Sequence, residues 1–201
     1  ATTLSGTGPF TVFAPTNAAF AALLTELGVT KEALLANKAL LTAVLTYHVL
    51  PGKVEASAVP GVLGQPITTV QGGVFKIESN NGLKITDGRN RVSTITSTDI
   101  QASNGVVHLV DKVLLPADKD IVATASALPD FSILVEAVVA AGLVTTLQGT
   151  GPFTVFAPTN AAFAALLTEL GVSKADLLAN TALLTKVLTY HVVPARVLKA
   201  E

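Results

Sequence analysis

The stretch GPFTVFAPTNAAFAALLTELGV occupies residues 8–29 and occurs again, without a single change, at residues 151–172. The similarity continues around it, because residues 1–55 and 144–198, aligned at an offset of 143, are identical at 44 of 55 positions. A period of this length is too long for one unit of a solenoid and fits a whole domain. We therefore predict that the chain is a window of about 1.4 periods of a tandem array, out of phase with the domains.

The window contains three kinds of segment in unequal number. The repeated part, which we call the half-domain, is present twice, at residues 1–55 and 144–198. Two other segments are present once each: a strand-rich segment at 56–117, and a lead-in segment at 118–143 that precedes the second half-domain. One complete domain can be assembled from these segments, and one half-domain is left over. Its apolar helix face must be covered, or the chain will associate through it.

These counts set the expected domain boundaries. We expect residues 1–117 to form a domain that lacks its N-terminal helix. Residues 118–201 are then the N-terminal part of the next repeat, which lacks its β half. Within that part we expect a linker, ADKDIVATASALPD, at 117–130 and an amphipathic helix at 131–143.

Three arrangements are compatible with the left-over half. Residues 1–117 can combine with the helix at 121–143 into a circularly permuted domain. Alternatively, the β half of a neighbouring chain completes residues 121–201 in a domain swap, or the window is one unit of a long filament. We favour completion between chains, by a swap or in a filament, because an uncovered half-domain is difficult to keep soluble.

The repeated stretch itself predicts a strand and a capped helix. GPFTVFAP is typical of a strand, and an apolar helical face follows it at Phe20, Leu23, Leu24 and Leu27. A side-chain oxygen of Thr16 or Asn17, and of Thr159 or Asn160 in the second copy, is expected to cap this helix. Gly28 is expected to end it.

The rest of the period predicts an α+β domain. Thr30 and Asn37 are expected to cap two further helices, the second with an apolar face of Leu41, Val44, Leu45 and His48. Strands are expected at 74–78, 83–87, 91–98 and 106–113, with a hairpin turn at Asn81-Gly82. The fold class is helices packed on a mostly antiparallel sheet or sandwich.

Composition argues against several classes of protein. The net charge is −1 and only 13% of residues are charged, so no basic surface is available for nucleic acid. No apolar run approaches the ~20 residues of a membrane-spanning segment. Without cysteine, the chain has neither disulfides nor a thiolate metal site.

Three motifs resemble the fasciclin (FAS1) family in order and spacing: TVFAPTNAAF, LTYHVLPGKV and NGVVHLVDKVLLP. DFSILVEAVVAAGL is similar to the N-terminal helix of that family. The resemblance implies a secreted, extracellular or cell-surface module, often in tandem, associated with cell adhesion, matrix organisation and biofilm formation. Near-identical repeats and the lack of an N-x-S/T sequon favour a prokaryotic member over a glycosylated animal or plant one.

The same resemblance points to the Tyr-His motif as a binding site, because this region has been linked to integrin binding in animal members. The motif is Tyr47-His48 here, and Tyr190-His191 in the second copy. For each histidine, and for His108, we favour a buried imidazole hydrogen-bonded to the backbone over a ligand contact.

No residues are spaced for catalysis, for a metal or for a cofactor, so we expect a non-enzymatic protein. The leading interpretation is an adhesion or structural module that self-associates and contacts cell-surface or matrix components. The alternative is a secreted binding module for a small apolar ligand or a glycan. A mildly basic stretch is expected to be a solvated sheet face, with an acidic-polysaccharide contact as the alternative: Lys53, Lys76, Lys84, Arg89 and Arg91.

Overall fold

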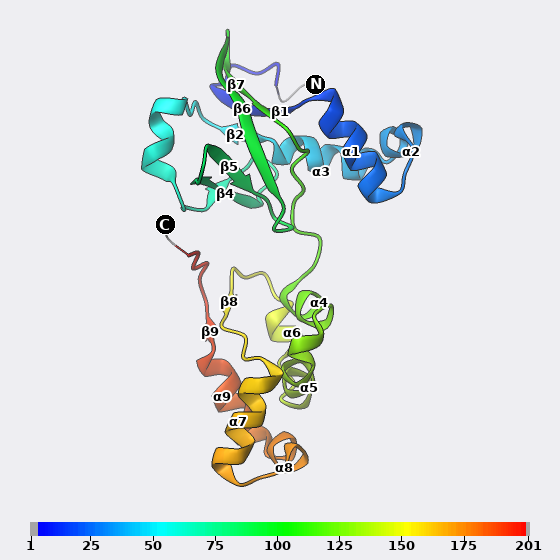
Figure 1. Cartoon of the computed structure of the whole chain (residues 1–201), viewed down its shortest axis with the longest axis vertical. Coiled ribbons are helices and arrows are strands. Elements are labelled where there is room, and N and C mark those ends of the chain that lie inside the picture. Colours follow the sequence, from blue (N-terminus) through cyan, green and yellow to red (C-terminus); the bar gives the residue numbers. More distant parts are fainter. Residues whose placement is uncertain (1–3, 200–201) are drawn as a thin grey trace. The chain divides into compact units, whose positions relative to one another are not determined.

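The computed structural model describes residues 4–199, which form two compact units (Figure 1). Unit 1 extends to Asp118 and also includes Leu198 and Lys199, and unit 2 is Lys119–Val197. The elements of unit 1 are β1 (Phe10–Pro15), α1 (Asn17–Leu27), α2 (Lys31–Ala36), α3 (Lys38–Tyr47), β2 (Val49–Pro51), a 3-10 helix (Ala56–Val62), β3 (Ile67–Thr68), β4 (Val74–Ser79), β5 (Leu83–Thr86), β6 (Val92–Ala102) and β7 (Gly105–Val110).

Unit 2 is mostly helical (Figure 1). Its elements are α4 (Ile121–Ser126), a 3-10 helix (Pro129–Phe131), α5 (Ser132–Ala140), α6 (Val144–Leu147), β8 (Thr154–Val155), α7 (Asn160–Leu170), α8 (Lys174–Ala179), α9 (Thr181–Tyr190) and β9 (Val192–Val193). No helix within residues 4–199 has the length and hydropathy to cross a bilayer.

One sheet of seven strands organises unit 1, in the order β2-β1-β7-β6-β5-β4-β3. β1 and β7 pair in parallel, from Phe10 opposite Gly105 to Pro15 opposite Val110, and the other neighbouring strands of this sheet pair antiparallel. Gly105 is required here, since a Cβ would lie 2.1 Å from the Phe10 carbonyl oxygen. The predicted α+β fold with a mostly antiparallel sheet is confirmed.

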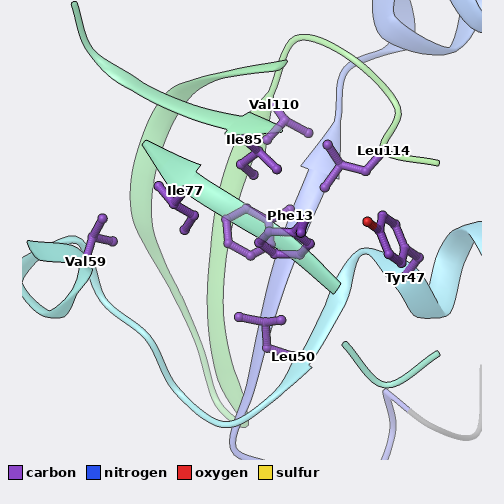
Figure 2. Packing of buried hydrophobic residues seen from close by; sticks show 9 residues of the cluster. Phe13, Tyr47, Leu50, Val59, Ile77, Ile85, Val110 and Leu114 are labelled. Carbon is purple, nitrogen blue, oxygen red and sulfur yellow. The ribbon is translucent and has the colours of Figure 1, made fainter. Parts of the chain in front are cut away.

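Two apolar clusters fill unit 1. The larger lies between the sheet and the end of α3, and Figure 2 shows its side chains: Phe13, Tyr47, Leu50, Val59, Phe75, Ile77, Ile85, Val110 and Leu114. The smaller joins α1, α2 and α3 to the segment after β7: Ala19, Leu23, Leu34, Val44, Val113 and Leu115. The helices of the first half-domain therefore depend on the strand-rich segment for their core.

The predicted helix ends are confirmed in both copies. Thr16 caps α1, because its Oγ1 accepts a hydrogen bond from the Ala19 N–H, and Thr159 caps α7 in the same way. Gly28 ends α1 in the left-handed conformation, with φ 64°. Thr30 and Asn37 cap α2 and α3.

Three expectations about helices were wrong in detail. The stretch 117–130 is not a plain linker, because Asp120 accepts a hydrogen bond from the Ala123 N–H and begins helix α4 there. The helix expected at 131–143 is shorter, Ser132–Ala140. On α3, Leu45 does not share the buried face of Val44: it is 45% exposed, whereas Tyr47 is buried.

Unit 2 packs its lead-in helix on the second half-domain. α5 lies against α7, α8 and α9, and one cluster holds the four helices together with α6: Leu134, Ala137, Val138, Leu147, Phe163, Leu177, Leu184 and Leu188. β8 is the counterpart of β1, but within the described residues it pairs only with β9. The edge that β7 occupies in unit 1 is therefore open in unit 2.

Candidate functional site

His48 lies at the C-terminal end of α3, with its imidazole buried between that helix and the segment after β7. Its Nδ1 is 2.7 Å from the Val44 carbonyl oxygen, and its Nε2 is 2.8 Å from the Leu114 nitrogen. A backbone N–H can only donate, so Nε2 accepts and Nδ1 carries the proton that is donated to Val44. The imidazole thus joins helix to segment as a neutral ring.

Burial lowers the pKa of His48 to about 4, because the charged ring would lose its hydration. The Val44 carbonyl and the Asp87 carboxylate raise the pKa but do not outweigh burial, and Arg91 lowers it further. Protonation of Nε2 would also set two N–H groups against each other at Leu114. At neutral pH the ring is therefore held in the uncharged form that fits its two partners.

Tyr47 is fully buried beside His48 and contacts the strand-rich segment. Its hydroxyl donates to the Val74 carbonyl oxygen at 2.6 Å, and its ring meets Phe75 edge-on at 6.0 Å between centroids. Contact of this Tyr-His pair with an external partner would require both side chains to leave the core of unit 1.

His108 lies in the middle of β7 and is also buried. Its Nε2 donates to the Val54 carbonyl oxygen at 2.8 Å, and its Nδ1 accepts from the Asp99 N–H at 3.2 Å. The ring therefore joins β7 to Asp99 of β6 and to the loop after β2, and like His48 it has a structural environment.

The same motif has the opposite environment in unit 2. Tyr190 is 89% exposed, whereas Tyr47 is 0% exposed, and Phe156 is 58% exposed, whereas its counterpart Phe13 is 1% exposed. His191 keeps the helix contact, with Nδ1 2.8 Å from the Val187 carbonyl oxygen, but is only half-buried. We call Phe156, Tyr190, His191 and the free edge of β8 the open β face.

Asn160 contacts the lead-in helix instead of capping its own helix. Its Oδ1 accepts from the Ile133 N–H at 3.0 Å, and its Nδ2 donates to the Pro129 carbonyl oxygen and the Ser132 hydroxyl, each at 3.0 Å. Asn17 occupies the same place in the first copy, where its side chain is exposed and has no hydrogen-bond partner within residues 4–199. In unit 2 this asparagine therefore binds the segment that precedes its half-domain.

Comparison with known proteins gives the family. A family model of the fasciclin domain matches residues 1–116 and 129–201. The chain belongs to the fasciclin domain family.

Relatives of this fasciclin chain come from bacteria and animals. It is 45% identical over 118 residues to Protein sll1483 of Synechocystis, an alignment of 56% of this chain and 58% of that protein. It is 32% identical over 166 residues to the pig transforming growth factor-beta-induced protein ig-h3, covering 80% of this chain and 22% of that protein. This chain therefore spans less than two thirds of the length of either relative.

A solved structure is also similar to this fasciclin chain. It is described as a FAS1 domain pair from the insect cell adhesion molecule fasciclin I. The TM-score is 0.45 at 17% sequence identity, over 98% of this chain and 67% of the other.

Sequence reasoning missed one buried ionic cluster of the first fasciclin unit. The Asp87 carboxylate accepts from Arg91 Nε and Nη2 at 3.0 and 2.7 Å and from the Leu115 N–H at 2.9 Å. Arg91 also donates to the Val113 carbonyl oxygen at 2.6 Å and pairs with Glu26 of α1. The sequence signal that could have revealed this cluster is the turn Asp87-Gly88 followed by Arg91, four residues after the aspartate.

This cluster changes the interpretation of the basic stretch. Four of its five cations pair with a carboxylate within the fasciclin chain: Lys53 with Glu55, Lys76 with Glu78, Arg89 with Asp118 and Arg91 with Asp87. These ion pairs largely neutralise the positive charge of the four side chains. An acidic polysaccharide therefore finds little free positive charge on this stretch.

One small cavity lies among apolar side chains of unit 2. An apolar cavity of about 20 Å³ in unit 2 lies among Ile121, Val122, Ala125, Leu134, Val135, Val138, Leu147 and Val155. That volume holds about one water molecule, whereas ligand pockets have about 300–1,000 Å³. Across residues 4–199 no three His, Asp or Glu side chains gather as metal ligands do.

The two copies allow a matched test of the tyrosine hydroxyl. Tyr47→Phe leaves the half-buried Val74 carbonyl without its side-chain donor, so unit 1 should lose about 1–2 kcal/mol of unfolding free energy. Tyr190→Phe, at the exposed position, should change the unfolding free energy of unit 2 by less than about 0.5 kcal/mol. Urea unfolding followed by circular dichroism measures both, and equal effects would contradict the difference in environment.

His48 predicts a pH dependence of unit 1. As the pH is lowered, the histidine of the unfolded chain, with a pKa near 6.5, binds a proton at a higher pH than the folded one does. The contribution of His48 to the unfolding free energy is therefore complete above pH 6.5. This contribution should fall by roughly 3 kcal/mol as the pH drops from about 6.5 to about 4. Because carboxylates titrate nearby, the measurement is the difference between the wild type and His48→Gln across pH 4–7. Parallel curves for the two proteins would refute the prediction.

Asn160 and Asn17 form a second matched pair. Asn160→Ala removes three hydrogen bonds to the lead-in segment and should lower the unfolding free energy of unit 2 by about 1–2 kcal/mol. Asn17→Ala removes no contact and adds a better helix former, so unit 1 should be unchanged or slightly more stable. Thermal unfolding of the two variants tests this, and a loss at Asn17 similar to that at Asn160 would count against it.

Proposed function

We propose that this chain is a non-enzymatic adhesion and structural module of an extracellular tandem fasciclin protein or fibre. The observation that carries the proposal is the open β face of unit 2. A neighbouring subunit or repeat covers this face with its strand-rich segment and so completes the domain. Many such contacts, one after another, build an array. The organisation expected from the sequence, an out-of-phase window of such an array, is part of this proposal.

The occupant proposed for the open β face is the strand-rich segment of a second copy, residues 56–117, which leaves that copy's own first half-domain in a domain swap. In unit 1 that segment supplies β7 to the edge of β1, and the Val74 carbonyl to the hydroxyl of Tyr47. Unit 2 carries the same tyrosine, the same histidine and the corresponding strand without these partners. An open strand edge accepts a strand from another molecule through its backbone hydrogen bonds.

Burial supplies the driving force for this completion. Phe156 and Tyr190 are the largest exposed apolar side chains of the open β face, and their counterparts in unit 1 are almost fully buried. Burying each one contributes about 1.5–3 kcal/mol. A face with two such aromatic residues and a strand edge is suited to a persistent structural contact.

The adhesive part of the proposal rests on the family. The motifs in both copies are those of fasciclin domains, whose resemblance implies secretion or display at the cell surface and binding to surface or matrix components. Tyr190 and His191 are accessible only while the open β face is uncovered, and an occupant of that face covers them. Attachment between surfaces that carry the chain then follows from completion of one molecule by another.

Self-association tests the proposal. The wild-type chain should sediment as oligomers that grow with concentration, and beads coated with it should clump. Phe156→Asp and Tyr190→Asp should each raise the concentration at the midpoint of association by about tenfold or more, because a carboxylate replaces a ring that association would bury.

The matched control is Val139→Asp, since Val139 is an exposed apolar residue of unit 2 that belongs to α5 and not to the open β face. This variant should associate like the wild type. A chain that stays monomeric at every concentration, and whose beads remain dispersed, contradicts the proposal.

A further inference from the structure

Two turns of unit 1 contain the same pair of residues, an asparagine followed by a glycine. Asn81-Gly82 lies between β4 and β5, and Asn104-Gly105 lies where β6 turns into β7. The glycine of each pair has no Cβ to shield its backbone nitrogen from the side-chain amide of the asparagine before it. The nitrogen can therefore attack Cγ of that asparagine, provided that the turn leaves both groups free to move.

Asn104 and Gly105 are held by hydrogen bonds and by strand pairing. The Asn104 Nδ2 donates to the carbonyl oxygens of Leu4 and Gly6, at 2.8 and 3.1 Å. The Asn104 carbonyl oxygen accepts from the Phe10 N–H at 3.0 Å, and Gly105 lies in β7 between β1 and β6. Closure of a ring here would require the side chain and the peptide plane to rotate, and so would break these contacts.

Asn81 and Gly82 have the opposite environment. Both are exposed, and the Asn81 side chain makes no hydrogen bond within residues 4–199. The Asn80 N–H closes the turn by donating to the Gly82 carbonyl oxygen at 3.2 Å, and the peptide bond between Asn81 and Gly82 has no backbone partner in the described part of the chain. A Cβ added to Gly82 would meet nothing within 4 Å. The side chain and the peptide plane are therefore free to rotate toward each other.

We propose that Asn81 is a site of spontaneous deamidation in the folded chain, whereas Asn104 is protected. The Gly82 nitrogen loses its proton to solvent and forms a bond to Asn81 Cγ. The bond from Cγ to Nδ2 breaks, and ammonia leaves after taking up a proton. Water then opens the succinimide ring, either at Cγ to give aspartate or at the main-chain carbonyl to give isoaspartate. One water is consumed and one ammonia is released, and nothing is oxidised or reduced.

The reaction changes both the charge and the backbone of unit 1. A carboxylate in place of a neutral amide takes the formal net charge from −1 to −2. Isoaspartate adds one carbon to the backbone of a turn whose two strands carry Ile77 and Ile85, which lie opposite each other in the core. This modification goes beyond the proposed function and does not depend on self-association.

Ageing of the full chain in mildly alkaline buffer, followed by mass spectrometry, tests the site. Trypsin cleaves on both sides of each turn, so Asn81 and Asn104 lie in separate peptides, 77–84 and 92–112. Peptide 77–84 should gain one mass unit and appear as two products, aspartate and isoaspartate, which chromatography separates. Peptide 92–112 should convert at least about tenfold more slowly, because the hydrogen bonds of its turn must break first.

Unfolding in guanidinium chloride is the matched control, because it removes the difference between the turns. There the two peptides should convert at similar rates. Asn81→Ser should remove nearly all of the mass gain of peptide 77–84, whereas Asn80→Ser should leave it unchanged. Both positions are exposed, so the two variants should keep the circular dichroism of the wild type.

Three results would overturn the proposal. The first is equal conversion of the two peptides in the folded chain, and the second is conversion of both in guanidinium chloride alone. The third is a product that is aspartate only, which would mean direct hydrolysis of the side chain without attack by the Gly82 nitrogen.

Discussion

The half-domain has two apolar faces, and the whole structure depends on how each is covered. One face takes the strand-rich segment, through Phe13 and Tyr47 in unit 1, and the other takes the lead-in helix, through Phe163 and Leu188 in unit 2. In each unit a single face is covered. Because the two copies are nearly identical in sequence, their differences in burial arise from the neighbouring segments and not from the copies themselves.

In unit 1 the strand-rich segment is held both by strand pairing and by side-chain hydrogen bonds to its backbone. Residues 113–115 are buried but lie outside any strand, so their backbone groups need other partners. His48 accepts from the Leu114 N–H, Asp87 accepts from the Leu115 N–H, and Arg91 donates to the Val113 carbonyl. The histidine of the Tyr-His motif therefore serves the integrity of the domain in unit 1.

Local features of the structure could be predicted from the sequence, because local chemistry determines them. Thr16 and Thr30 as helix caps, and Gly28 as a helix end, need only neighbours three or four residues away. The α+β fold followed from periodicity and the hairpin signal. The family resemblance drew on motifs over the whole chain.

What could not be predicted depends on distant partners. Leu45 satisfied the helical period, yet it is exposed, whereas its counterpart Leu188 is buried against α5. Asn160 had an obvious local role as a cap, and its true partners lie 27 to 31 residues earlier in the chain. The pairing of Arg91 with Glu26 joins residues 65 apart, a separation at which no sequence period gives a signal.

The two tyrosines give this chain a natural optical reporter. They are its only tyrosines and it has no tryptophan, so its near-ultraviolet emission comes from one buried and one exposed phenol. A quencher dissolved in the buffer reaches Tyr190 and not Tyr47. Any molecule that covers the second phenol will shield it, and the event can be followed in the unlabelled protein.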